Sequence, residues 1–186
     1  MKTRIMDAQN HFNIANIITF ANITCGLTAL YLVTEERFII ASIIAWCAGV
    51  LDIADGKVAR KFNLSSEFGI QLDSFADFLS FVIMPAFFLF FGLSLETSLE
   101  KVLIGIILVW YVISGLRRLI EFNLEAVTKT EKDRYFDGVP TPLGAILLWV
   151  LWLNFMGGFI INIWLIAFII LLVALSLNSH IKIPHP

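Results

Sequence analysis

Apolar residues run along this sequence in stretches whose length matches the hydrocarbon core of a bilayer. A helix needs about 20 mostly apolar residues to cross that core. The pattern predicts spanning helices over residues 14–33, 38–51, 69–92 and 102–119. The second of these continues as a helix into a polar stretch that ends near Arg60.

Two further apolar runs, residues 143–155 and 159–177, are separated by Gly157 and Gly158. Adjacent glycines interrupt helices, so the two runs are read as separate spans. The fifth span is short, although it could begin as early as Val139. We count six spans, and an arrangement of five spans with a re-entrant segment is the alternative.

The composition supports a membrane protein and leaves no room for a separate soluble domain. Of the 186 residues, 59% are hydrophobic and 15% are charged, and the mean hydropathy is +0.86. We therefore expect an all-α integral membrane protein with one membrane domain over residues 14–177. Residues 1–13 are interpreted as an interfacial segment and residues 178–186 as a cytoplasmic tail. The sequence shows no nucleic-acid-binding pattern.

The distribution of positive charge predicts the orientation in the membrane. With six spans, all 13 Lys and Arg except Arg37 and Lys101 fall on the same side. Loops rich in Lys and Arg remain in the cytoplasm. Both termini and the polar ends of the second and third spans are therefore expected to face the cytoplasm. Polar side chains at these ends would therefore be open to cytosolic substrates.

Four aspartates interrupt the apolar pattern, Asp52 and Asp55 on the second helix and Asp73 and Asp77 on the third. Spacings of three and four residues place each pair on one helical face. Charges at membrane depth are costly unless a partner neutralises them, so two facing helices would form a carboxylate cage for a cation. Because no His or Cys lies within this stretch, Mg²⁺ or Mn²⁺ is expected before Ca²⁺, and zinc is not.

Small residues and cations accompany these acids. Gly56, Ala59 and Gly69 leave the neighbouring helix faces bare, so that a phosphate or nucleotide can approach the backbone. Arg60 and the lysines near it supply positive charge for phosphate oxygens. The alternative is a purely ionic contact between helices, and it would leave four acids facing fewer cations.

The stretch from Asp52 to Asp77 reads D-x2-D-G-x2-A-R-x8-G-x3-D-x3-D. It resembles the signature of the CDP-alcohol phosphotransferase family at every fixed position. Members of that family are similar to this chain in having about six membrane helices and a cytosol-facing polar cavity. The resemblance extends over most of the chain, and it implies a homodimer formed through membrane helices.

The resemblance implies a role for each aspartate and for the residues around them. Asp52, Asp55 and Asp73 would bind one or two divalent metal ions, and Asp77 would bind metal and act as general base toward the acceptor hydroxyl. The first helix begins IANIITFANITCG, which is similar to the polar start of that helix in the family. Candidates for binding the CDP-lipid are Asn16, Thr19, Gly56, Ala59, Arg60, Ser66 and Gly69. For Asn16 and Thr19, helix packing is the alternative role.

Three further segments resemble the phosphatidylserine synthase branch of the family and its archaeal archaetidylserine relatives. They are FDGVPTP, the tail SHIKIPHP and GLRRLIEFN. In the third, Glu121 stands where the branch has a second arginine. Because the carboxylate of serine requires a cation, this departure makes other basic residues necessary. Arg117 and Arg118 are candidates for binding the acceptor.

The expected function is metal-dependent transfer of a phosphatidyl-type group to the hydroxyl of L-serine, with release of CMP. The donor would be CDP-diacylglycerol or its archaeal ether equivalent, taken from the surrounding membrane lipids. Alternative acceptors are inositol phosphate and glycerol phosphate, and an alternative donor is CDP-choline or CDP-ethanolamine with diacylglycerol as acceptor. A membrane prenyltransferase would lack the D-G-x2-A-R core. A divalent-cation channel or transporter would explain neither Arg60 nor the glycines that leave helix faces without side chains.

Overall fold

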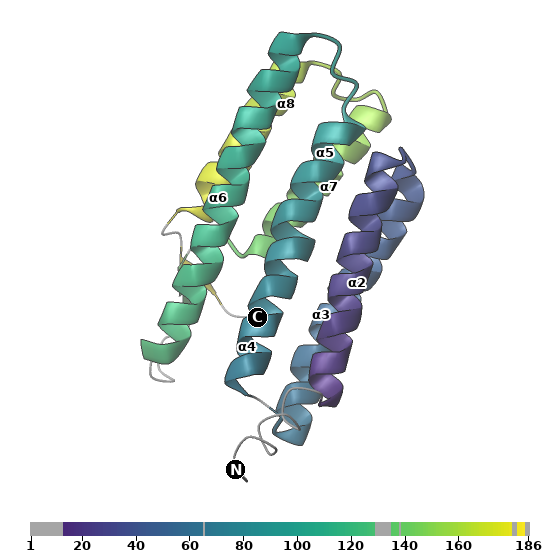
Figure 1. The fold of residues 1–186 in the computed structure, drawn as a ribbon. Coiled ribbons are helices and arrows are strands. Elements are labelled where there is room, and N and C mark those ends of the chain that lie inside the picture. The colour runs from purple at the N-terminus through teal and green to yellow at the C-terminus, as the bar shows by residue number, and fades with distance from the viewer. Residues whose placement is uncertain (1–12, 65, 129–134, 138, 180–181, 185–186) are drawn as a thin grey trace. The chain divides into compact units, whose positions relative to one another are not determined.

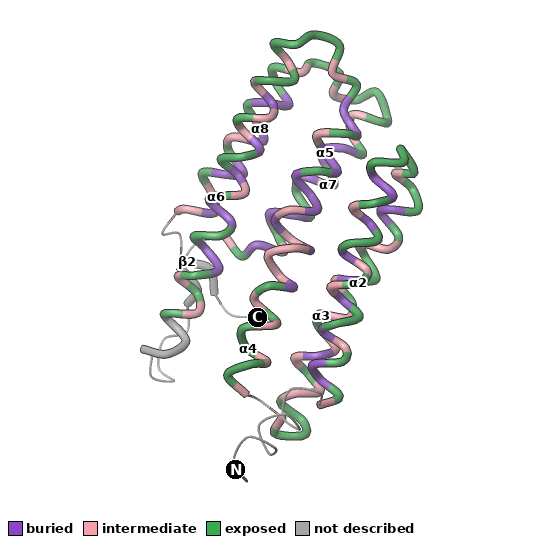
Figure 2. The backbone as a smooth tube through the Cα atoms, viewed as in Figure 1, coloured by how far each residue is buried: buried purple, intermediate pink, exposed green. Residues whose placement is uncertain are grey.

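The computed structural model describes residues 13–64, 66–128, 135–137, 139–179 and 182–184, and helices dominate it (Figure 1). The chain divides into two compact units after Ser80. Along each helix, buried positions recur between exposed ones, as Figure 2 shows. This alternation is the pattern expected of helices that pack on one face and contact lipid on another.

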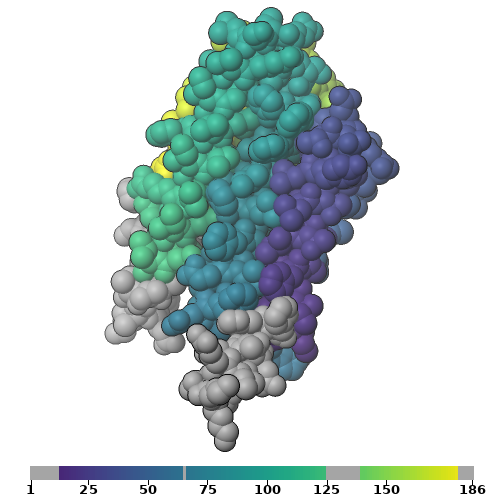
Figure 3. All heavy atoms as spheres, in the orientation of Figure 1, coloured from purple at the N-terminus to yellow at the C-terminus, as the bar shows by residue number. Residues whose placement is uncertain are grey.

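The first unit contains α2 (Ile14–Thr34), α3 (Phe38–Phe62) and α4 (Glu67–Asp77). The helices α2 and α3 lie side by side and pack through small buried side chains, including those of Ala29 and Ala41. Large apolar side chains of α2 are exposed, among them those of Ile17, Leu27 and Tyr31, and the helix is visible in purple in Figure 3. Such an apolar exposed face is suited to contact with lipid chains.

Polar caps fix the ends of these helices near the site. Asn13 caps α2, since its Oδ1 accepts the backbone N–H of Asn16 at 2.8 Å, and its Nδ2 donates to the Leu64 carbonyl at 3.2 Å. The helix α3 ends where Asn63 takes a left-handed conformation with φ 52°, a common C-terminal signal. Ser66 then caps α4 by accepting the N–H of Gly69 at 3.0 Å.

After α4 the helix continues without a break through a π-helical turn, η1 (Phe78–Ile83), into α5 (Met84–Gly92). The second unit also contains α6 (Ser98–Thr128), α7 (Thr141–Met156) and α8 (Ile163–Leu177). A π-helical turn displaces carbonyls from regular pairing. The hydroxyl of fully buried Tyr111 on α6 donates to the carbonyl of Phe81 in this turn at 3.0 Å.

Two short strands, β1 (Tyr135–Asp137) and β2 (Lys182–Pro184), pair antiparallel with Phe136 opposite Ile183. The strand β1 overlaps the start of the segment FDGVPTP, and β2 lies within the segment SHIKIPHP. The backbone therefore brings these two segments together within the second unit.

The prediction of an all-α membrane protein is confirmed. Four helices are long and apolar enough to cross a membrane, at Ile14–Thr34, Phe38–Phe62, Glu67–Gly92 and Ser98–Leu124, whereas α7 and α8 are shorter apolar helices. The last helix begins later than residue 159, because Asn162 caps it by accepting the N–H of Trp164 at 2.9 Å. The domain prediction for residues 14–177 stays a prediction, and residues 1–12 lie outside the described part.

Two glycines of α6 give a matched test of this packing. A Cβ on Gly115 would lie 2.7 Å from a methyl carbon of Val82, whereas one on Gly105 would meet its nearest neighbour, Phe90, at 3.7 Å. Gly115→Ala should destabilise the protein by about 1–3 kcal/mol through overpacking. Gly105→Ala should be neutral or stabilise it by up to about 1 kcal/mol, because alanine favours helix. Thermal unfolding in detergent measures both, and equal melting temperatures would contradict this packing.

Candidate active site

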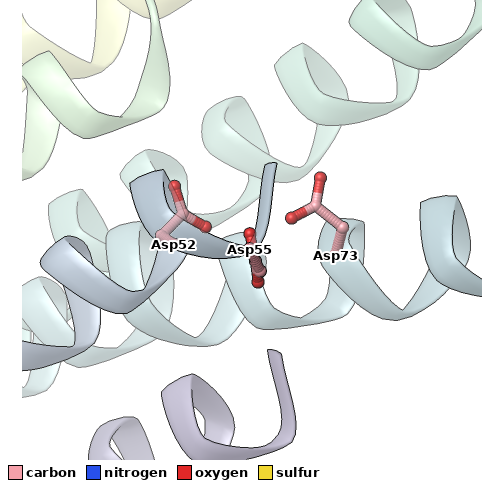
Figure 4. A group of neighbouring side chains, drawn as sticks. All are labelled: Asp52, Asp55 and Asp73. Carbon is pink, nitrogen blue, oxygen red and sulfur yellow. The ribbon is translucent and has the colours of Figure 1, made fainter. Parts of the chain in front are cut away.

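Three carboxylates converge where α3 faces α4. Asp52 and Asp55 come from α3 and Asp73 from α4, and one oxygen of each lies within 4.8 Å of the others. Figure 4 shows Asp55 between the other two. Asp55 is only 3% exposed, Asp52 is half-buried and Asp73 is exposed. The cluster is therefore open on the side of Asp73.

The fourth aspartate, Asp77, is the last residue of α4 and directly precedes the π-helical turn. Its carboxyl group lies close enough to that of Asp52 for their charges to repel each other. Asp77 Oδ1 and Asp55 Oδ2 are buried and have no hydrogen-bond partner among the described residues. Buried acceptor oxygens normally have partners. A set of carboxylate oxygens with unsatisfied members fits a hard divalent cation such as Mg²⁺ or Mn²⁺.

A cavity of about 220 Å³ lies beside the carboxylates, within the first unit. All seven residues predicted to bind the CDP-lipid line it, and so do Asp55 and Asp73. The lining contains one arginine, Arg60, whose positive charge acts on Asp73. The structure thus brings the predicted donor-binding residues to one place.

Two glycines of the signature shape this cavity in different ways. A Cβ on Gly69 would lie 3.0 Å from Asn16 Oδ1 and 3.2 Å from Ser66 Oγ, so the glycine allows α2 and α4 to approach closely. A Cβ on Gly56 would lie 3.5 Å from Arg60 Nη1, which is ordinary contact. Gly56 therefore leaves space beside the guanidinium group, where a phosphate could enter.

The two polar residues of α2 that line the cavity, Asn16 and Thr19, are each 3% exposed. The hydroxyl of Thr19 donates to the carbonyl of Ala15 at 3.1 Å, and Thr19 lines the cavity together with Asp55. The bond to Ala15 stays within the helix and leaves the acceptor lone pairs of the hydroxyl available. Packing and ligand contact are thus compatible for Thr19.

Sequence reasoning missed Asn22 and Ser80. Asn22 Nδ2 donates to Asp52 Oδ1 at 3.3 Å, and Ser80 Oγ donates to Asn22 Oδ1 at 2.8 Å. Asn22 follows Asn16 and Thr19 at intervals of three residues, and this spacing was a signal that could have placed it on the same face of α2. No comparable signal exists for Ser80, which is 58 residues away from its partner.

The two residues predicted to bind the acceptor, both on α6, differ in exposure and in ion pairing. Arg117 is exposed and forms an ion pair with Glu121, with Nη2 and Oε1 2.8 Å apart. Arg118 is 5% exposed. Glu121, which replaces the second arginine of the branch, therefore neutralises Arg117 and not Arg118.

Comparisons with known proteins agree with the signature. The family model for CDP-alcohol phosphatidyltransferases matches residues 12–177. The chain is 33% identical over 170 residues to the CDP-diacylglycerol--serine O-phosphatidyltransferase of Bacillus subtilis, covering 91% of this chain and 88% of that protein. It is 33% identical over 171 residues to the protein of the same name from Methanocaldococcus jannaschii, covering 92% and 73%.

A protein of the same name from Helicobacter pylori is 30% identical over 133 residues, which cover 72% of this chain and 54% of that protein. The chain thus spans about half the length of the Helicobacter pylori relatives that it matches. The family match nevertheless includes all four aspartates and every described helix from α2 to α8. The chain is therefore a multi-pass membrane protein that belongs to the CDP-alcohol phosphatidyltransferase family.

Proposed function

We propose that this protein transfers a phosphatidyl-type group from a CDP-linked lipid to the hydroxyl of L-serine and releases CMP. The observation that carries the proposal is the convergence of Asp52, Asp55 and Asp73 beside a cavity lined by the donor-binding residues of the signature. The names of the similar proteins support serine as the acceptor. The donor is CDP-diacylglycerol or an ether-linked equivalent.

One or two divalent cations, Mg²⁺ or Mn²⁺, would be held by the four aspartates, Asp52, Asp55, Asp73 and Asp77. A bound cation would neutralise the diphosphate oxygens and the charge that develops on the departing CMP. The guanidinium group of Arg60 would contact phosphate oxygens from the side that Gly56 leaves open. The donor would thereby be held in a fixed orientation before the acceptor attacks.

The reaction exchanges one phosphorus–oxygen bond for another. The serine oxygen attacks the phosphorus attached to the lipid, and the bond to the bridging oxygen breaks, so that CMP leaves with the electron pair. Asp77 accepts the proton of the serine hydroxyl. The buried Oδ1 of Asp77 has no hydrogen-bond donor among the described residues and is available to receive it.

Serine also brings a carboxylate, and a basic residue is needed to pair with it. Of the two candidate residues, Arg118 is a buried cation that forms no ion pair within the described residues. Arg117 already pairs with Glu121. We therefore propose Arg118 as the residue that recognises the serine carboxylate.

The orientation and the assembly are part of the proposal. The concentration of Lys and Arg on one side of the predicted spans supports an active site and termini that face the cytoplasm. Family membership supports a homodimer in the membrane. Access of a membrane-impermeant thiol reagent to single cysteines tests the orientation, and cross-linking in membranes tests the dimer.

Release of CMP tests the reaction directly. The purified protein should release CMP from CDP-diacylglycerol when L-serine and Mn²⁺ or Mg²⁺ are present, and EDTA should abolish the release. Inositol phosphate, glycerol phosphate and no acceptor are the comparisons, and an archaeal ether donor is tested in parallel. Release with another acceptor would overturn the assignment of serine. No release with any donor or acceptor would favour the transport alternative.

Two aspartate variants separate proton transfer from metal binding. Asp77→Asn should reduce the turnover by about 10²–10⁴-fold, because it removes the proton acceptor, and should largely retain binding of the CDP-lipid. Asp52→Asn should weaken metal-dependent binding of the donor itself. Turnover and donor binding are measured on both proteins, and equal, mild losses would contradict these roles.

Substitution of Arg118 tests acceptor recognition. Arg118→Gln should raise the KM for serine by about 10–100-fold, because it removes a charged hydrogen-bond donor, while the KM for the CDP-lipid changes little. Arg117→Gln should have a smaller effect, since Glu121 already neutralises that guanidinium group. Steady-state kinetics with each substrate varied in turn provides the measurement. The assignment fails if the two substitutions raise the KM for serine equally.

A further inference from the structure

The side chain of Asn22 connects two segments of the first unit and is completely buried. It lies on α2, on the face that also carries Asn16 and Thr19. Its amide nitrogen donates to Asp52 Oδ1 at 3.3 Å, and its amide oxygen accepts from Ser80 Oγ at 2.8 Å. A hydrogen-bonded chain thus runs from Ser80 through Asn22 to an aspartate of the cluster.

The chemistry of these groups determines which way the amide points. A carboxylate only accepts hydrogen bonds, whereas a serine hydroxyl both donates and accepts. If the amide of Asn22 were reversed, its oxygen would face Asp52 and two acceptors would be opposed. Asp52 therefore selects the direction of the amide, and the hydroxyl of Ser80, which donates to Asn22 Oδ1, holds the amide in that orientation.

Close packing holds Ser80 in position. A Cβ on Gly26 of α2 would lie 3.1 Å from Ser80 Oγ and 3.2 Å from a side-chain carbon of Leu79. Glycine at this position thus lets α2 approach the start of η1 closely enough for Ser80 to reach Asn22. Ser80 is itself 8% exposed, so water has little access to compete for its hydrogen bond.

We propose that Asn22, oriented by Ser80, is a positioning residue for the metal centre. Its amide occupies one lone pair of Asp52 Oδ1, fixes the plane of that carboxylate and leaves the remaining lone pairs for the cation. An amide donor also offsets part of the repulsion between Asp52 and the other acids without adding charge. The inference rests on the proposed binding of a divalent cation to this cluster. It adds a residue outside the signature to that site.

Binding of Mn²⁺ without any substrate tests the inference. Electron paramagnetic resonance of the purified protein gives the fraction of bound Mn²⁺ during a titration. Asn22→Leu keeps the approximate volume and removes the amide, and it should raise the Kd for Mn²⁺ by about 10–100-fold, as expected for a residue that orients a ligand. Ser80→Ala leaves the amide and removes only the group that orients it, so it should raise the Kd by a smaller factor.

A matched control lies on the same helix. Thr28 is exposed, and its hydroxyl donates to the carbonyl of Thr24 at 2.7 Å within the helix. Thr28→Val should leave the Kd for Mn²⁺ unchanged. In activity assays, the Mn²⁺ concentration for half-maximal rate should rise for Asn22→Leu, and saturating Mn²⁺ should restore most of the turnover number. A merely structural role would instead lower turnover and thermal stability at unchanged Mn²⁺ affinity.

The outcomes are distinct. A wild-type Kd for Mn²⁺ in folded Asn22→Leu would overturn the role of Asn22. If that variant does not fold, Ser80→Ala provides the test. An unchanged Kd for Mn²⁺ in Ser80→Ala would then overturn the inference. Wild-type protein that binds no Mn²⁺ would overturn the proposed metal dependence and the inference with it.

Discussion

Carboxylates held this close together on apolar helices repel one another, and the arrangement around them reflects that repulsion. Oxygens of Asp52, Asp55 and Asp73 lie within 4.8 Å of one another, and Asp77 adjoins Asp52. Two unit charges about 4 Å apart interact by about 4 kcal/mol at an effective dielectric constant near 20. Such a cluster is stable as a set of anions only with a compensating cation, and the unsatisfied oxygen of Asp55 would be a ligand for one.

In the first unit, helix caps and a close approach at a glycine position the helices that carry these charges. Asn13 and Ser66 cap the helices that flank the cavity, and Gly69 allows α4 to approach Asn16 on α2. The same three helices that carry the carboxylates and Asn22 also line the cavity proposed to bind the donor. A site built on helices keeps its geometry better than one built on loops. The proposed metal binding and donor binding would therefore depend on one set of contacts.

The sequence predicted the helices and the aspartate cluster because both follow from local periodicity. Apolar run length indicated the spans, and a spacing of three residues predicted that Asp52 and Asp55 share a helical face. The beginning of α8 was misplaced by a few residues, because the cap formed by Asn162 has a weaker signal than apolar run length. The π-helical turn after Asp77 has no pattern in the sequence by which it could have been predicted.

Contacts between residues far apart in the sequence could not be predicted in the same way. The bond between Asn22 and Ser80 joins residues 58 positions apart, and only the packing of α2 brings them together. Arg117 and Arg118 are neighbours in the sequence, yet one pairs with Glu121 and the other is buried. The direction of each side chain depends on which helix face packs, and a single sequence does not specify that face.

The central claim is that a divalent cation binds between α3 and α4. Crystals of the protein soaked with Mn²⁺ allow the ion to be located by its anomalous X-ray scattering. The account predicts anomalous density within coordination distance of Asp52, Asp55 and Asp73. Density at another place in the protein, or no density beside these carboxylates in a fully soaked crystal, would contradict it.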